Sequence, residues 1–415
     1  MNHKTFRQSA LLTFAIILLA ASAQAQSGAT RPRRVPPSQP AADAQPADAR
    51  PAPQQPARRA DDAPLLTPSA SASAQAQPGG DTGRAYTLFQ QKQYAEAARV
   101  AKAAASADPS NSEAWKIAGF AEFGLKQYAE AAADLQRALD LQRAAGAEDA
   151  NTADALGKSL ALAEQYDRAL PLLVAATTRA NAKPDAETYY YRGLSEYRTK
   201  KVDDAVRSFE AAVKADPKNA VSLFYLGRIS YERGQADAAI SALNRATAAD
   251  PRFTEGWRLL TVAYLLRAGQ AGGQGPQASA DYLSAVRTSD ALIKLSADES
   301  AITLNGQALI GAQQFPRAAL VLERAAANPN VQGSTLYLLG VAHSRAKNMP
   351  KAVAALERAA AKSPDDVNVY RELGYALEVS KQYAKALAAY ERGAQLAPNE
   401  ADLKESAERV RPFAK

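Results

Sequence analysis

The sequence predicts an all-α solenoid, a stack of repeated helix pairs, and three observations carry this prediction. A small residue recurs at a period close to 34 residues through most of the 415-residue chain. An alanine follows seven of these small residues at a spacing of twelve, and several units close on a proline. A fixed period of this length is the signature of a solenoid, in which each unit buries its apolar face against its neighbours.

The recurring small residue is a glycine in seven units and a threonine in one. The series comprises Gly119, Gly157, Gly193, Gly227, Thr261, Gly306, Gly340 and Gly374. We expect these residues where the two helices of a pair cross, because a larger side chain there would hold the backbones apart. The nine units begin near residues 78, 112, 150, 186, 220, 254, 299, 333 and 367.

Each unit divides into two amphipathic helical stretches separated by a polar turn. In the unit at 186–219, the apolar positions of both stretches fall at spacings of three, four and seven, which place them on one helical face. The second stretch ends at Pro217, because proline cannot continue a helix.

These residues resemble the tetratricopeptide repeat family. The shared pattern is a bulky residue, a small one four positions later, an alanine twelve beyond that, and a closing proline. One unit that fits it well carries Trp115, Gly119, Tyr128, Ala131, Leu135 and Ala138. The resemblance covers residues 81–399 and implies a right-handed α-solenoid of about nine helix pairs.

The period is disturbed in the sixth unit and ends after Pro398. We expect residues 269–277 to lengthen the internal turn of the sixth unit. Residues 400–415 are predicted to form a C-terminal capping helix, whose apolar stripe comprises Leu403, Ala407 and Val410.

The N-terminal 80 residues read as two segments outside the solenoid. Residues 1–25 have the pattern of a cleavable signal peptide: Lys4 and Arg7, an apolar run at 11–21, and small residues at 23 and 25. The run is shorter than the roughly 20 residues that span a bilayer, which disfavours an uncleaved anchor. We expect a periplasmic or secreted protein with no stable membrane insertion after cleavage.

Residues 26–80 are predicted to be a disordered linker rich in proline, alanine and glutamine. They hold eleven of the chain's 23 prolines and no aromatic residue, which leaves too little apolar surface to offset ordering entropy. An inert spacer is the favoured role, and a partner-binding tail is the alternative.

Composition and charge remove several classes of function. The chain has no cysteine and only two histidines, so it lacks the residues for thiolate sites and has too few for most histidine-based catalytic or metal sites. The net charge of +7 is not gathered on one face, as a nucleic-acid binder would require. We find no catalytic motif, and we expect no cofactor, no metal, no nucleic-acid partner and no enzymatic activity. We expect His343 to be a packed core residue.

The resemblance implies a concave groove, lined by the first helix of each unit, that holds a peptide or a partner helix. The side chains carried over to this groove are Lys116, Phe120, Tyr190, Leu194, Phe224, Arg228, Arg258, Tyr337, Val341, Arg371 and Tyr375. Tyrosine, phenylalanine and arginine are enriched at binding hot spots. Tyr190, Phe224, Arg228 and Arg258 are favoured because they lie off the apolar stripe, whereas Tyr197 and Tyr231 are expected to pack between repeats.

A C-terminal carboxylate clamp, which some members of the family carry, is not expected. The matching positions hold Lys116 and Phe120, then Asp154 and Ala155, without the asparagines. The sequence therefore predicts a non-catalytic scaffold that binds protein or peptide partners in the bacterial cell envelope. The alternative is an accessory subunit of envelope polysaccharide synthesis or export, with polysaccharide as a further partner.

Overall fold

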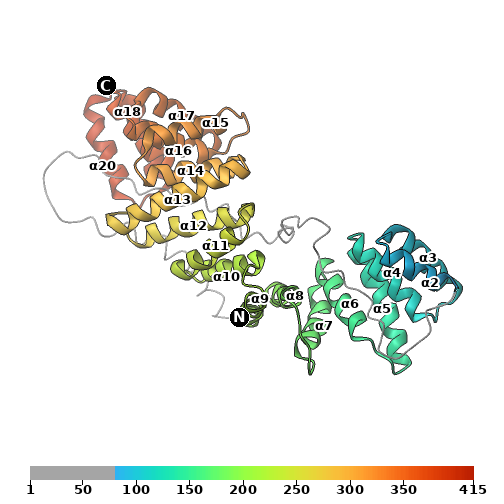
Figure 1. The fold of residues 1–415 in the computed structure, drawn as a ribbon. Helices are drawn as coiled ribbons and strands as arrows, with labels where there is room; N and C mark the ends of the chain where they lie inside the picture. The colour runs from blue at the N-terminus through green and yellow to red at the C-terminus, as the bar shows by residue number, and fades with distance from the viewer. Residues whose placement is uncertain (1–79) are drawn as a thin grey trace, which may run out of the picture. The chain divides into compact units, whose positions relative to one another are not determined.

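The computed structural model describes residues 80–415, and every regular element within them is helical (Figure 1). The described chain divides into two bodies between Phe253 and Thr254. The predicted signal peptide and all but the last residue of the predicted linker lie outside the described residues.

The first body contains five helix pairs. They are α2 (Gly80–Gln90) and α3 (Tyr94–Ala107), α4 (Ser112–Gly124) and α5 (Tyr128–Ala144), α6 (Ala150–Leu162) and α7 (Tyr166–Thr178), α8 (Ala186–Arg198) and α9 (Val202–Ala215), and α10 (Ala220–Glu232) and α11 (Ala236–Ala249).

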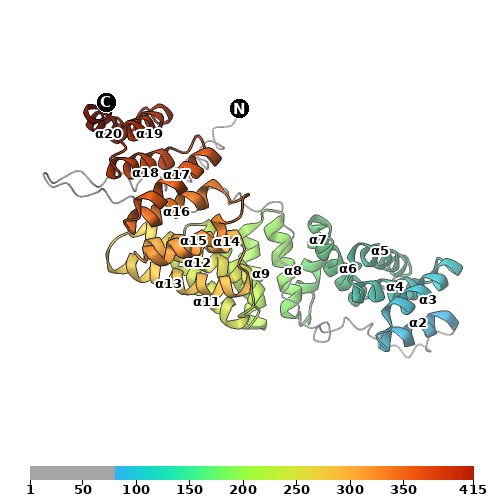
Figure 2. The same cartoon turned by 90° about the horizontal axis from the view of Figure 1, so that it is seen from above.

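The second body contains four helix pairs and a final helix. They are α12 (Thr254–Gln270) and α13 (Gly275–Leu295), α14 (Glu299–Gly311) and α15 (Phe315–Ala326), α16 (Gly333–Arg345) and α17 (Met349–Lys362), α18 (Val367–Val379) and α19 (Tyr383–Leu396), and then α20 (Ala401–Val410) with a 3₁₀ turn at Arg411–Phe413. Figures 1 and 2 show the helices of each pair side by side. The first helices begin within two residues of the predicted unit starts, which confirms the period as a series of helix pairs.

The first helix of most units starts at a side-chain cap. Asn111, Asp149, Asp185 and Asn219 each accept a hydrogen bond from a backbone N–H two or three residues later, and Asp298 does the same in the second body. Such caps satisfy one of the free N–H groups of the first turn and are worth about 1 kcal/mol each.

The turn within each unit reverses the chain through one residue in the left-handed region, except in the sixth unit, where Gly272 and Gly273 both have positive φ. In the second unit, Lys126 has φ of 63°, its N–H donates to Phe123 O, and Gln127 N–H donates to Glu122 O. This is the Schellman arrangement that ends many helices. The equivalent residue is a lysine in five units but a glycine in the fifth, Gly234, with φ of 73°.

The recurring glycines lie where the helices of a pair cross, as predicted. A Cβ atom on Gly340 would lie 2.4 Å from Leu356 Cγ, and one on Gly227 would lie 2.6 Å from Leu243 Cγ. The large residue comes sixteen positions after the glycine in both cases. Thr261 fits the same place because its hydroxyl donates to Trp257 O and to Thr288 Oγ1, both at 2.9 Å.

The sixth unit departs from the prediction. Its extra residues extend α12 and α13, and only residues 271–274 remain between the two helices, so the lengthened turn is wrong. The extended ends are joined by an ion pair in which Nη2 of the half-buried Arg267 lies 2.6 Å from Oδ1 of the buried Asp281. Gln277 also donates to Asp281, at 3.2 Å. These contacts stabilise the additional helical turns.

The capping helix is confirmed as α20. Leu403, Ala407 and Val410 are buried, and α20 packs against α19. His343 is buried as well, with Nε2 3.3 Å from Glu323 Oε1, as expected for a core residue. Within residues 80–415, no helix is long and apolar enough to cross a bilayer, and no three acidic or histidine side chains gather as metal ligands do.

Candidate partner-binding site

Seven of the eleven predicted groove residues are buried. They are Lys116, Phe120, Tyr190, Leu194, Phe224, Tyr337 and Val341. The premise that Tyr190 and Phe224 lie off the apolar stripe is wrong, because they are only 3% and 5% exposed. The ring of Tyr190 lies 6.1 Å from that of Tyr225, and the ring of Phe224 lies 5.1 Å from that of Phe253. Tyr190 and Phe224 therefore pack in the core of the first body rather than face a partner.

The other four predicted residues, Arg228, Arg258, Arg371 and Tyr375, are half-buried. Arg258 Nη2 lies 2.9 Å from Asp298 Oδ2, and Asp298 caps the first helix of the next unit. Arg371 pairs in the same way with Glu400 and Asp402 at the start of α20. A partner-binding role for these four stays a prediction, but two arginines already serve to join consecutive units.

Buried lysines join units in the first body by the same device. Lys116 Nζ lies 3.1 Å from Asp149 Oδ2, and Lys158 Nζ lies 3.3 Å from Asp185 Oδ2. Both aspartates cap the next first helix. A cation on one unit thus meets the carboxylate that starts the next. Sequence spacing alone gives no sign of this, because the partners are about one unit apart.

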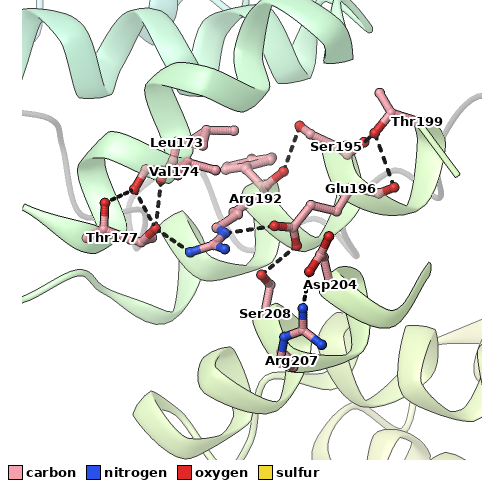
Figure 3. A network of polar contacts seen from close by, with 12 residues as sticks. Leu173, Val174, Thr177, Arg192, Ser195, Glu196, Thr199, Asp204, Arg207 and Ser208 are labelled. Atoms are coloured by element: carbon pink, nitrogen blue, oxygen red, sulfur yellow. Dashed lines mark hydrogen bonds and ion pairs between the residues drawn. The ribbon is translucent and has the colours of Figure 1, made fainter. Parts of the chain in front are cut away.

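A buried polar network ties three consecutive helices of the first body (Figure 3). Arg192 of α8 donates to Thr177 Oγ1 of α7 at 2.9 Å and, through Nε, to Glu196 Oε1 at 2.8 Å. Ser208 of α9 donates to Glu196 Oε2 at 2.6 Å. Both oxygens of Glu196 are thereby satisfied, as a buried carboxylate requires.

The equivalent glutamate of the second unit has a different partner. Glu122, 2% exposed, shares Lys102 with Asp134, which stands where the fourth unit has Ser208. Burial raises the pKa of Glu122 to about 7 against the pull of Lys102, and burial also raises the pKa of Asp134. Two neighbouring buried carboxyl groups cannot both ionise cheaply.

The fourth and fifth units hold an aromatic cluster around Tyr225. Tyr225 stacks on Phe209 with ring centroids 5.0 Å apart and planes 9° apart, and it meets Tyr197 edge-on at 5.6 Å. Tyr225 is fully buried, yet its hydroxyl has no hydrogen-bond partner in the structure. Burial raises the pKa of Tyr225 to about 12.

The cluster ends in a half-exposed surface that we name the aromatic–arginine edge: Tyr166, Tyr197, Arg198 and Arg228, with Tyr231, which follows Arg228 by three residues on the same face of α10. Tyr197 donates its hydroxyl to Glu232 Oε1 at 2.7 Å, and Arg228 Nε donates to the same oxygen at 2.9 Å. The Arg228 guanidinium also lies 5.5 Å from the Tyr197 ring centroid. Tyr197 packs on a neighbouring repeat, as predicted, and both Tyr197 and Tyr231 keep exposed surface. The packing of Tyr231 between repeats stays a prediction.

Arg198 is the member of this edge that the sequence does not single out. Its guanidinium lies 5.8 Å from the Tyr166 ring centroid, and its Nε is buried without a hydrogen-bond partner. Among residues 80–415 it pairs with no carboxylate, whereas Arg192 and Arg228 each do. A buried donor without a hydrogen-bond partner lowers the free energy of unfolding by about 1–3 kcal/mol, so the position of Arg198 does not serve stability alone.

Comparison with known proteins places this geometry in a family. The model described as tetratricopeptide repeat matches residues 82–149, 155–220, 192–252, 303–367 and 337–401, which together make up more than half of the chain. No curated protein matches the chain.

Solved structures with some similarity to this chain have low sequence identity. A chain of the APC/C hetero-tetramer Cut9-Hcn1 is 16% identical; the match covers 75% of this chain and 58% of that one, with a TM-score of 0.39. YrrB, described as a TPR protein with an unusual peptide-binding site, is 12% identical over 49% of this chain and 99% of its own, with a TM-score of 0.41. A tetratricopeptide repeat protein from Parabacteroides merdae is 14% identical over 63% and 98%, also at 0.41. On the strength of the family match, this chain belongs to the tetratricopeptide repeat family.

Proposed function

We propose that the protein is a non-catalytic scaffold whose aromatic–arginine edge binds a protein or peptide partner. The tetratricopeptide repeat fold generally serves protein–protein interaction, which supports the general role. The observation that carries the site is Arg198, which has no acidic partner in residues 80–415 and stands beside the half-exposed ring of Tyr166. Tyrosine and arginine are the residue types that dominate binding energy at interfaces.

We place this activity in the cell envelope, on the basis of the predicted signal peptide at residues 1–25. A polysaccharide partner is the weaker alternative. Guanidinium groups already lie against the rings of Tyr166 and Tyr197, which leaves less ring face for a sugar to stack on. A peptide can instead use the arginine and the ring edges together.

Site-directed photo-crosslinking in intact cells tests this proposal. The variant Tyr231→p-benzoylphenylalanine places the crosslinker on the edge, and Leu320→p-benzoylphenylalanine places it on the second body, where Leu320 is 65% exposed. We expect a discrete protein adduct at position 231 that is absent or much weaker at position 320. Equal adducts at both positions, or adducts at 231 made up only of polysaccharide, would contradict the proposed site.

A further inference from the structure

The turn beside the aromatic–arginine edge carries three cations without acidic partners in the described chain. Arg198 ends α8, and Lys200 and Lys201 lie exposed in the turn before α9. None of the three forms an ion pair within residues 80–415. The acids on either side along the chain are already paired: Glu196 with Arg192, Asp203 with Arg233 and Asp204 with Arg207.

This concentration of charge is particular to the fourth unit. The equivalent positions are Leu162, Glu164 and Gln165 in the third unit. In the fifth unit they are Glu232, Gly234 and Gln235. The repeat therefore tolerates a neutral or acidic residue at the first two places and a neutral one at the third, although the middle place is a lysine in five units. The combination of all three cations is thus not a requirement of the fold.

The guanidinium of Arg198 is held in place before any ligand arrives. It lies against the Tyr166 ring, and its Nε is buried. Arg198 also lowers the pKa of the fully buried Tyr225, against the larger effect of burial. A cation with a fixed position loses little rotamer freedom when it binds an anion.

We propose that Arg198, with Lys200 and Lys201, binds the side-chain carboxylates of an acidic peptide segment. This inference rests on the proposed function and names the chemistry of its partner. Planar guanidinium suits a carboxylate, to which it can donate two parallel hydrogen bonds. Tyr197 and Tyr231 lie on the same edge and offer apolar contact to the rest of the peptide, which a small inorganic anion would not use. The exposed lysines add attraction that salt screens.

Fluorescence anisotropy with a fluorescein-labelled hexaglutamate peptide tests this inference directly. The peptide carries a C-terminal amide, so that only side-chain carboxylates are available. We expect the full chain to bind it, and Arg198→Gln to weaken binding by about tenfold or more, since hydrogen bonds between charged groups are the stronger ones. Lys200→Gln and Lys201→Gln should each weaken it by about two- to threefold at low salt.

Arg207→Gln is the matched control. Arg207 lies near the same turn and its loss removes the same charge, but it is exposed and already paired with Asp204. Its affinity should stay within about twofold of the wild type, because a screened charge at a distance contributes little. Circular dichroism should show that Arg198→Gln and Arg207→Gln keep their helices. Arg198→Lys should bind the peptide with intermediate affinity, because lysine keeps the charge but lacks the planar guanidinium group.

Several outcomes would overturn the inference. These are no binding of hexaglutamate, equal losses in Arg198→Gln and Arg207→Gln, and displacement of the peptide by inorganic phosphate at matched charge concentration. Binding of polygalacturonate in preference to the peptide would replace the peptide with an acidic polysaccharide. If the crosslink at position 231 persists while hexaglutamate does not bind, the chemistry of the partner is refuted and the scaffold function is not.

Discussion

The fourth and fifth units and the seventh and eighth units use the same repeat to build different interiors. In both regions a glycine on the first helix faces a large residue sixteen positions later. That residue is Phe209 opposite Gly193 in the fourth unit, but it is a leucine in the other three: Leu243 opposite Gly227, Leu322 opposite Gly306 and Leu356 opposite Gly340. The leucines show that aliphatic side chains are enough to close this helix crossing. The aromatic cluster and the unpartnered Arg198 therefore exceed what folding needs, and we attribute the surplus to binding.

The largest expected difference between the two regions is in how much they tolerate a methyl group at the crossing. In Gly340→Ala the new Cβ would lie 2.4 Å from Leu356, whereas in Gly193→Ala it would lie 2.9 Å from Phe209. We expect Gly340→Ala to lower the free energy of unfolding by about 2–3 kcal/mol and Gly193→Ala by about 1 kcal/mol, since overpacking outweighs the better helix propensity of alanine. Urea unfolding measures both, and an equal or larger loss in Gly193→Ala would remove the contrast in packing.

The second unit has two buried carboxyl groups, Glu122 and Asp134, and they should make its stability depend on pH. The folded-state pKa of Glu122 is raised to about 7, above its ordinary value. Its contribution to stability is therefore fully present at pH below the ordinary pKa and is lost as pH rises through about 7. We expect the stability of the first body to fall by an amount on the order of 1 kcal/mol between acidic and mildly alkaline pH, and Glu122→Gln to abolish that fall.

Glu196→Gln is the matched control for this pH dependence. Glu196 is bonded to Arg192 and Ser208, so the substitution should destabilise the protein at every pH in the same range. Thermal unfolding at a series of pH values distinguishes the two variants. A pH slope that survives in Glu122→Gln would show that another group is responsible.

A smaller effect separates two buried tyrosines. The hydroxyl of Tyr225 has no partner, whereas that of Tyr390, in the ninth unit, donates to Glu378 Oε2 at 2.7 Å. Tyr225→Phe should raise the free energy of unfolding by about 1 kcal/mol, and Tyr390→Phe should lower it by about 1 kcal/mol. The same urea measurements check the pair, and a loss of stability in Tyr225→Phe would mean that its hydroxyl is satisfied.

The smallest expected effect concerns the left-handed residues of the turns. Lys200 and Lys347 have φ of 63° and 64°, so glycine at either place should stabilise by roughly 0.5–1 kcal/mol. The two substitutions should thus be alike in stability and differ only in binding. Lys200→Gly should weaken hexaglutamate binding, whereas Lys347→Gly should not. Equal effects on the peptide would argue against a site in the fourth unit.

The sequence predicts the helix pairs well and the exposure of side chains on the first helices poorly, for physical reasons that particular residues show. Gly340 and Leu356 are set by local spacing, and a 34-residue period repeats that spacing in every unit. The burial of Tyr190 depends instead on how Tyr225 of the next unit packs on it. Arg258 is occupied by a capping aspartate forty residues away, which spacing within one unit does not reveal.

Arg198 was outside the predicted groove set for a related reason. Arg198 follows Tyr197 at the end of a first helix. The only local sequence feature that marks it as a binding residue is the group of cations that includes Lys200 and Lys201. What distinguishes it is the absence of an acidic partner in the described residues, and the sequence cannot show which arginines are already paired.

The most direct test of the central claim is to measure capture and stability together in Arg198→Gln. If the surplus of the fourth and fifth units serves a partner, the crosslink formed from position 231 should fall by about tenfold while the free energy of unfolding falls by no more than about 0.5 kcal/mol. Retained capture with a loss of about 2 kcal/mol or more in stability would contradict the account, because Arg198 would then be holding the fold together.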